Sequence, residues 1–202
     1  AVRKQGESIY RRELRFRDPE LDRYRQLMLY NLNACEAVLT DNNDIRIYTD
    51  GKEKFKALLW EMEHARSYIH LQYYIIKRDE LWKQIEEVLI RKARQGVEVR
   101  VLFDSMGCRT MHNKDWERLE AEGIHVAEFF PAVLGKLQLR VNYRNHRKIA
   151  VIDGRIGFVG GFNIGREYLG RDPKFGYWRD THICLEGSAV LSLAIRFILD
   201  WN

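Results

Sequence analysis

The chain has 202 residues, and its 34 Lys and Arg against 29 Asp and Glu give it a formal net charge of +5. Hydrophobic residues at 46% and charged residues at 31% are typical of a globular protein and exclude a disordered or collagen-like chain. The three cysteines, Cys35, Cys108 and Cys184, are too scattered for a zinc ribbon or a disulfide framework, and no apolar run reaches the ~18 residues of a membrane-spanning helix.

Residues 1–43 are predicted to be a charged arm with a short helix near 20–33. The first 25 residues contain eight Lys or Arg and five acids, and they lack a periodic apolar pattern. Such a segment is ordinarily a solvated surface. The alternative is a juxtamembrane segment attracted to anionic lipid, where each basic residue near the surface adds about 1 kcal/mol of binding free energy.

Residues 44–202 are predicted to form one domain in which strands and helices alternate. Its first part contains β-branched and apolar segments, expected to be strands, over 45–50, 67–76, 97–104 and 124–130. Amphipathic segments, expected to be helices, separate them over 51–66, 79–96 and 114–123. This alternation predicts an α/β protein, specifically an α/β/α sandwich around a mixed, largely parallel sheet.

The second part of this domain is organised differently. Two short apolar strands, 146–153 and 155–161, are separated by Asp153-Gly154, a strong signal for a type I′ hairpin. A helix over 164–169, a loop rich in turn residues, a strand over 179–187 and an amphipathic helix over 188–202 complete the pattern. The apolar stretch 129–139 before the hairpin has no clear period, so it is either a core connection or a loop that enters the bilayer interface.

The hairpin carries the residues with the clearest chemical meaning. A histidine can act as nucleophile or as general acid and base, a lysine and an asparagine can donate to phosphate oxygens, and glycines allow close backbone approach. His146 and Lys148 alternate onto one face of the first strand. The whole pattern, H-x-K-x4-D-x6-G-G-x-N, is formed by His146, Lys148, Asp153, Gly160, Gly161 and Asn163.

The charge around this motif favours an anion. Between Glu128 and Asp153 the chain has five basic residues and no acid, and phosphate is the natural ligand for such a field. A second His-x-Lys, at His112 and Lys114, lacks the Asp and the Gly-Gly-x-Asn, and we interpret it as the entry to a helix. The five histidines outside the motif lack the spacing of metal ligands, and we expect them to be surface or hydrogen-bonded core residues.

The full pattern resembles the HKD motif of the phospholipase D superfamily, with Gly161 in place of the usual Ser. The segments IYTDGKEKF, HLQYYII, NYRNHRKIAVIDG, GFVGGFNIGREYLG and DPKFGYWRDTH resemble the amino-terminal catalytic half of bacterial cardiolipin synthases, so the likeness covers about residues 35–202. The resemblance implies a phospholipase D-like fold and an enzyme that makes cardiolipin from two phosphatidylglycerols, with no cofactor and no metal.

The resemblance also implies a role for the motif residues. His146 is the expected nucleophile, which forms a phosphohistidine, and a histidine of a second HKD motif is the general acid and base; these two roles could be exchanged. Lys148 and Asn163 are expected to hold the phosphoryl oxygens, while Gly160 and Gly161 give the phosphate access to the backbone.

Two acids complete the candidate site. Asp180, in the segment RDTH, is expected to bond the far ring nitrogen of His146 and fix its tautomer, unless it merely pairs with Arg179. Asp153 belongs to the motif, but a DG hairpin already explains an Asp at this position, so its role could be structural.

The sequence departs from the resembled family in ways that bear on the whole enzyme. Members usually begin with hydrophobic membrane segments and carry a second HKD motif, and neither is found here. Gln72, Cys108 and Arg166 stand where Glu, Ser and Asp are common and could alter head-group contacts. We therefore expect a fragment that forms one half-site, completed by the second HKD half or by a second copy of the chain. It is expected to act on phosphatidylglycerol at the cytoplasmic face of a bacterial cytoplasmic membrane and to bind no nucleic acid.

Two other functions fit the same residues. One is a phospholipase D-type nuclease with a single motif per chain that acts as a homodimer, for which a net positive charge is suitable. The other is a non-catalytic domain that binds anionic lipid head groups. The segments NIGREYLG and FGYWRDTH resemble the lipid enzymes and favour the transferase.

Overall fold

The computed structural model describes residues 2–11, 13, 15–16, 18–129 and 144–202. The chain divides into two compact units, Ala1–Asn43 and Asp44–Asn202, and the motif lies entirely within the second. Most of the apolar stretch 129–139, for which we expected either a core connection or a bilayer loop, lies outside the described residues.

The first unit contains three helical segments in its described residues. They are α1 (Val2–Tyr10), the 3₁₀ helix η1 (Pro19–Tyr24) and α2 (Arg25–Cys35). Where α1 packs on α2, Ile9 and Leu32 are each only 1% exposed. α2 was expected, whereas α1 forms where we expected only an arm, because even a charge-rich helix can bury one apolar side chain against a neighbour.

The second unit is built around a seven-stranded sheet with the order β1-β7-β6-β5-β2-β3-β4. The central strand, β5, is buried along its whole length, as its apolar sequence KIAVI requires. All seven strands lie in segments that were predicted to be strands: β1 (Asp44–Asp50), β2 (Tyr68–Tyr73), β3 (Glu98–Asp104), β4 (His125–Phe129), β5 (Lys148–Ile152), β6 (Ile156–Gly160) and β7 (Arg179–Glu186).

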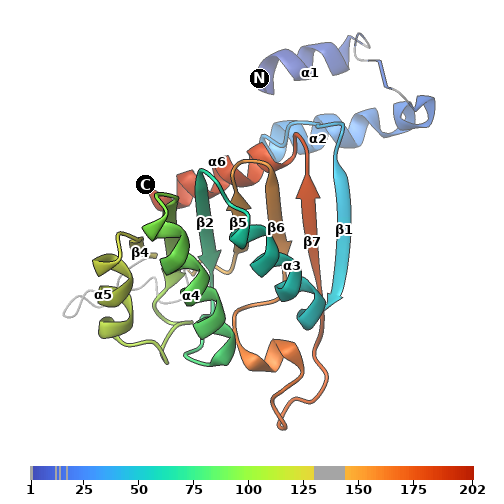
Figure 1. The fold of residues 1–202 in the computed structure, drawn as a ribbon. Coiled ribbons are helices and arrows are strands. Elements are labelled where there is room, and N and C mark those ends of the chain that lie inside the picture. Colours follow the sequence, from blue (N-terminus) through green and yellow to red (C-terminus); the bar gives the residue numbers. More distant parts are fainter. Residues whose placement is uncertain (1, 12, 14, 17, 130–143) are drawn as a thin grey trace, which may run out of the picture. The chain divides into compact units, whose positions relative to one another are not determined.

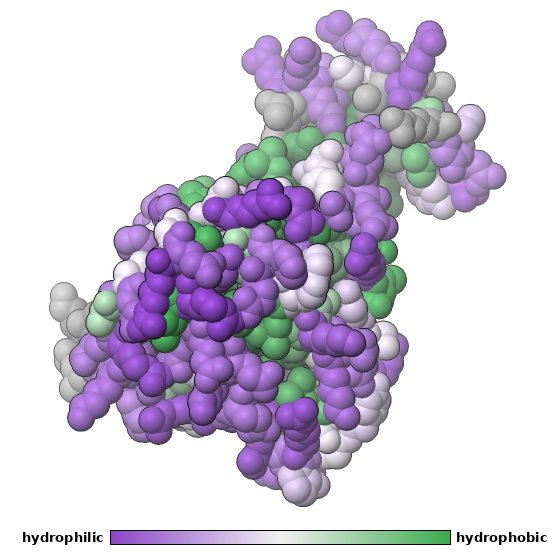
Figure 2. All heavy atoms as spheres, in the orientation of Figure 1, coloured by the Kyte–Doolittle hydropathy of each residue, from purple (hydrophilic) through white to green (hydrophobic). Residues whose placement is uncertain are grey.

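Helices cover both faces of the sheet (Figure 1). One face is covered by α3 (Gly51–Glu63), α4 (Glu80–Arg94) and α5 (Asn113–Ala121), around a core that includes Phe55, Ile85 and Leu119. The other face is covered by α6 (Val190–Trp201), where Val190 packs with Ile149 and Val151 of β5. The predicted α/β/α sandwich is confirmed. Its outer surface over α3 and α4 is mainly hydrophilic (Figure 2), as expected of amphipathic helices.

The balance of strand directions differs from the prediction. Only β2–β3 and β3–β4 are parallel pairs, whereas β1–β7, β7–β6, β6–β5 and β5–β2 are antiparallel. The expected mixed sheet is confirmed, but the expectation that it is largely parallel is wrong. The reason is that β5, β6 and β7 follow one another as antiparallel neighbours, without the helical crossovers that parallel neighbours need.

The helix predicted after β6 is present as a short 3₁₀ helix. This helix, η2 (Arg166–Leu169), ends at Gly170, whose φ of 64° is the left-handed conformation that glycine accepts readily. Among the described residues, no helix is both long and apolar enough to cross a bilayer.

Candidate active site

The two halves of the motif meet at one end of the sheet. β5 and β6 are antiparallel neighbours, with Ile149 opposite Val159, so the start of β5 lies beside the end of β6. β5 is also antiparallel to β2, with Lys148 opposite Tyr73 at the end of that strand. The residues that precede β5 and those that follow β6 therefore share one edge of the sheet.

His146 and Lys148 contact each other at this edge. Lys148 Nζ lies 2.9 Å from His146 Nδ1 and 2.6 Å from its main-chain oxygen, and the Tyr74 ring centroid lies 4.4 Å from the imidazole centroid. Burial lowers the pKa of Lys148 to about 8, although the charge of Asp180 opposes the shift. His146 is exposed, but partial burial and the charge of Lys148 lower its pKa. The imidazole is therefore predominantly neutral at neutral pH.

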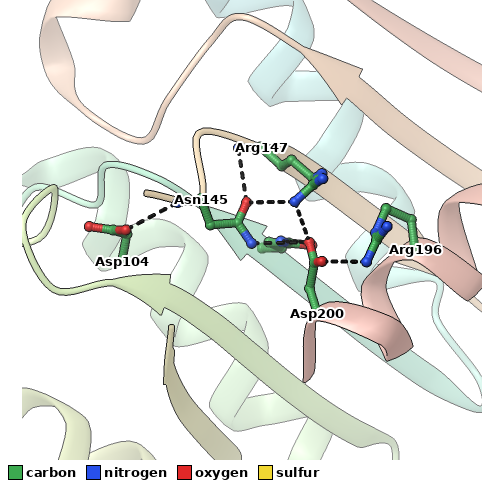
Figure 3. Close-up of polar contacts among 6 residues, drawn as sticks. Asp104, Asn145, Arg147, Arg196 and Asp200 are labelled. Carbon is green, nitrogen blue, oxygen red and sulfur yellow. Dashed lines mark hydrogen bonds and ion pairs between the residues drawn. The ribbon is translucent and has the colours of Figure 1, made fainter. Parts of the chain in front are cut away.

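The chain on both sides of His146 is held by a carboxylate from α6 (Figure 3). The side chain of Asp200 is 5% exposed. Its Oδ2 accepts hydrogen bonds from Asn145 Nδ2 at 3.0 Å and from an Arg147 guanidinium nitrogen at 2.9 Å. Asn145 Oδ1 in turn accepts the main-chain N–H of Arg147 at 3.2 Å. His146 is thus held through its two sequence neighbours, while its own ring contacts Lys148.

Three more groups complete this polar cluster. Gln72 donates to Asp200 at 2.6 Å, and Arg196 donates to it at 2.7 Å. The main-chain N–H of Asn145 donates to the buried Asp104 at 3.3 Å (Figure 3). Asp200, Asp104 and Asn145 were not among the site residues predicted from the sequence. One signal was present, because the last turn of a helix disfavours a carboxylate, and an acid in the last turn of α6 therefore indicates a tertiary partner.

Close packing against β7 explains Gly160 and Gly161. A Cβ atom on Gly161 would lie 1.9 Å from Asp180 Oδ1, and a Cβ atom on Gly160 would lie 2.4 Å from the Cα of His182. A serine at position 161, the usual residue of the HKD motif, would therefore displace Asp180. The structure thus gives both glycines a packing role beside the backbone access expected of them.

Asp180 lies near Lys148 rather than in a hydrogen bond with His146. Its Oδ1 accepts the main-chain N–H of Thr181 at 2.6 Å, and its charge acts on the pKa of Lys148. In the described part of the chain, no hydrogen bond joins Asp180 to His146. The orienting bond that we expected is therefore absent from this conformation, and Asp180 is linked instead to the motif lysine through its charge.

Asn163 is buried and joins three segments near the site. Its Oδ1 accepts the main-chain N–H of Ile75 at 3.0 Å, and its Nδ2 donates to the Tyr168 hydroxyl at 2.9 Å. An asparagine amide has two hydrogens, so one more is available for a ligand. The structure therefore adds a structural role to the phosphate contact that we expected.

Asp153 lies at the opposite end of β5 from the site. It forms the hairpin turn as expected, with φ of 54° followed by 63° at Gly154. Burial alone would raise the pKa of its carboxyl group, but hydrogen bonds from three main-chain N–H groups lower it below its ordinary value. These bonds support the structural role that the sequence left open for Asp153, because they fasten the turn to the start of β2. The three donors are Arg66, Ser67 and Tyr68, at 2.8, 2.8 and 2.9 Å.

A buried histidine lies behind the site on β7. His182 is 0% exposed, and neither of its ring nitrogens has a hydrogen-bond partner among the described residues. Burial, together with the charges of Lys54 and Lys148, lowers its pKa to about 2. The expectation of a surface or hydrogen-bonded histidine is therefore wrong for His182, which is neutral and enclosed.

Comparison with known proteins identifies relatives of the chain. A family model described as "Cardiolipin synthase, PLD-like domain" matches residues 58–173. The chain is 48% identical to the major cardiolipin synthase ClsA of Bacillus subtilis over 201 residues, which are 100% of this chain and 42% of that protein. It is 55% identical to cardiolipin synthase 2 of Staphylococcus epidermidis over 177 residues, which are 88% of this chain and 36% of that protein. The chain thus spans about two fifths of the length of these curated relatives.

Solved structures share the fold at low sequence identity. NucT from Helicobacter pylori matches with a TM-score of 0.61 and 14% identity, over 79% of this chain and 96% of that chain. A phosphatidylserine synthase from Haemophilus influenzae matches with a TM-score of 0.59 and 18% identity, over 77% of this chain and 36% of that chain. These likenesses show the fold alone.

Proposed function

The chain belongs to the family of cardiolipin synthases with a phospholipase D-like domain, and from that membership we propose that it forms one half-site of an enzyme that makes cardiolipin from two phosphatidylglycerols. The observation that carries the proposal is the pair formed by exposed His146 and buried Lys148. A predominantly neutral imidazole can attack phosphorus, and the adjacent lysine can hold the phosphoryl oxygens.

The reaction is proposed to occur in two displacements. In the first, a ring nitrogen of His146 bonds to the phosphorus of one phosphatidylglycerol, the P–O bond to its head-group glycerol breaks, and the leaving oxygen takes a proton from an acid of the second half-site. In the second, the head-group hydroxyl of another phosphatidylglycerol bonds to phosphorus and returns a proton to that group. The P–N bond breaks, and cardiolipin and free His146 result.

Lys148, whose pKa of about 8 leaves it mainly protonated at neutral pH, is proposed to meet the phosphate as an ammonium ion. Burial favours the neutral amine, whereas a bound phosphate and the nearby Asp180 favour the ammonium form. The second amide hydrogen of Asn163 is proposed to donate to the same phosphate. Charge that develops on the phosphoryl oxygens would thus be met by donors already in place.

The second half-site is proposed to come from another HKD half of the parent protein or from a second copy of this chain. The substrate is proposed to be phosphatidylglycerol at the cytoplasmic face of a bacterial cytoplasmic membrane. The shorter length of the chain relative to its curated relatives is consistent with a missing partner half.

The test is His146→Ala in the intact enzyme that contains this chain. Transfer should fall below a tenth of the parent value with the thermal unfolding curve unchanged, because losing the nucleophile raises the barrier while an exposed side chain adds little stability. A folded His146→Ala enzyme that retains a tenth or more of the parent transfer would contradict the assignment. Plasmid cleavage measured beside lipid transfer distinguishes the nuclease, and binding of anionic lipid without transfer distinguishes the non-catalytic domain.

A further inference from the structure

The loop over residues 170–178 joins η2 to β7 and extends beyond the end of the sheet (Figure 1). Most of its aromatic and basic side chains are exposed. Phe175 is 47% exposed and Tyr177 is 67% exposed, and Arg171 and Lys174 are also exposed. The loop enters β7 two residues before Asp180, which packs on Gly161. It therefore projects from the same end of the sheet as the candidate active site.

The loop is built on one aspartate. The main-chain oxygen of Asp172 accepts the N–H groups of Phe175 at 3.1 Å and Gly176 at 2.9 Å. Its Oδ1 accepts the N–H of Lys174 at 3.0 Å, and the φ of 62° at Gly176 completes the turn. These hydrogen bonds give the exposed rings a defined support.

A chain of contacts joins the tip of the loop to the motif. The ring of Trp178 packs edge-on against Phe175 at 5.5 Å and against Tyr168 at 5.0 Å between centroids. The Tyr168 hydroxyl accepts the hydrogen bond from Asn163. Two aromatic contacts and one hydrogen bond therefore connect the exposed tip to Asn163, a residue of the motif.

The composition of the tip suits the interface of an anionic bilayer. Aromatic rings are enriched at the level of lipid head groups, and basic side chains add attraction to anionic lipid. The Lys174 ammonium lies 5.4 Å from the Phe175 ring centroid, so cation and ring occupy the same tip. Asp172, the acid of the loop, is paired with Arg166 at 3.6 Å, and its other carboxylate oxygen accepts the main-chain N–H of Lys174 within the loop.

From these observations we infer that loop 170–178 docks the chain on an anionic phospholipid bilayer, with Phe175 and Tyr177 in the interface and Arg171 and Lys174 at the head groups. The inference rests on the proposed function, because it turns the end of the sheet that carries His146 toward the bilayer that contains that substrate. The competing occupant is a second half-site that covers the same rings, and it predicts no contact between this loop and lipid.

The first experiment is flotation of the 202-residue chain with phosphatidylglycerol vesicles and with phosphatidylcholine vesicles. The double variant Phe175→Ala/Tyr177→Ala should bind phosphatidylglycerol vesicles about tenfold more weakly, because it removes two interfacial rings. The matched control is Trp60→Ala, because Trp60 is an aromatic on α3 that is 56% exposed. The start of α3, at Gly51, packs on η2, and Trp60 lies near the other end of the helix. The binding of this variant should equal that of the parent.

The second experiment separates this loop from the basic residues of the first unit, which could also bind vesicles. Acyl chains brominated near the head group quench nearby tryptophans, and Trp178 is a native reporter at the base of the tip. Trp178→Phe should remove most of the quenching by brominated phosphatidylglycerol vesicles, and Trp60→Phe should leave it unchanged. The inference is overturned by parent-like binding of the double variant, by quenching that survives Trp178→Phe, or by no binding of the parent chain.

These readouts are independent of catalysis, so the docking and the proposed reaction can fail separately. His146→Ala should lose transfer and still float with phosphatidylglycerol vesicles. Docking without any transfer by the intact parent enzyme would refute the reaction alone, whereas transfer without docking through loop 170–178 would refute this inference alone.

Discussion

The side chains that hold His146 in place lie outside the motif. Asp200 and Asp104 come from α6 and from the end of β3, and they reach Asn145 and Arg147 on either side of the histidine. Regular spacing along the chain reveals residues that share a strand, but it carries no information about an acid more than fifty positions away. The positioning of His146 is therefore a property of the folded chain.

Asp200→Ala should lower turnover in the intact enzyme about 100-fold and change KM for phosphatidylglycerol little, because a small displacement of a reacting group costs rate more than binding. Steady-state kinetics at several lipid concentrations measure both constants. Asp115→Ala is the matched control, since Asp115 is also buried and paired with an arginine, Arg78, but lies at the start of α5. Equal losses in the two variants would mean that Asp200 acts only through stability.

His182 should make the chain sensitive to acid. Its pKa in the folded state is about 2, against about 6.5 when it is unfolded, so between these values only the unfolded state binds the proton. The contribution of His182 to the free energy of unfolding is therefore complete above pH 6.5. It falls by about 1.4 kcal/mol for each pH unit below that value. In urea titrations, the free energy of unfolding should fall between pH 7 and pH 5 in both proteins. The fall should be about 2 kcal/mol smaller in His182→Gln than in the parent chain. An unchanged fall would contradict the enclosed, neutral state of His182.

At the scale of elements, periodicity and turn signals were sufficient to predict every strand of the sheet. Alternating apolar residues and the Asp153-Gly154 turn depend on near neighbours, which a sequence displays directly. The direction of β5 relative to β2 depends instead on which distant strands pair. Helix α1 was missed because, among its described side chains, Ile9 alone is buried, and one buried residue leaves no periodic apolar pattern in the sequence. The same division holds in the site. The alternation of side chains along a strand predicted that His146 and Lys148 share a face, whereas the contacts of Asp180 depend on which distant segments meet.

Asp153→Ala should destabilise the hairpin without removing the reacting groups. The carboxylate accepts three main-chain N–H groups, and its loss should cost about 2–3 kcal/mol of unfolding free energy. Turnover per folded molecule should fall far less than in His146→Ala. Asp50→Ala is a useful comparison in the same urea titration, since it removes a cap with two such acceptor contacts on α3 and should cost about 1 kcal/mol. A smaller loss for Asp153→Ala than for Asp50→Ala would contradict its role between β5 and β2.

At the scale of the whole molecule, one motif supplies one histidine, His146, at the end of the sheet where the candidate active site lies. Displacement at phosphorus needs a nucleophile on one side and a proton donor on the other, and general acid catalysis is worth about 10²–10⁴-fold. The second unit has its own sheet with a core on each face, so we expect the 202-residue chain to fold.

The purified chain should therefore show a cooperative unfolding transition by circular dichroism and almost no phosphatidyl transfer as a monomer. Transfer should be measured at several protein concentrations with sedimentation in parallel. Rapid transfer by a sedimenting monomer would refute the half-site, whereas a rate that rises with the square of concentration would show that two copies can build one site.

The pairing of the hairpin also fixes the spacing of the motif residues along the chain. Ile152 pairs with Ile156 and Ile149 with Val159, so the two strands run from the turn in continuous register. Their ends farthest from the turn carry Lys148 and Gly160. The number of residues between Lys148 and Gly160 is therefore fixed by the two paired strands and the turn that joins them. One residue inserted into either strand alone would shift the register and turn the motif residues of that strand to the other face of the sheet. A longer hairpin is compatible with the chemistry only if both strands gain two residues together, which keeps each side chain on its face and moves Lys148 and Gly160 about 6.6 Å farther from the turn.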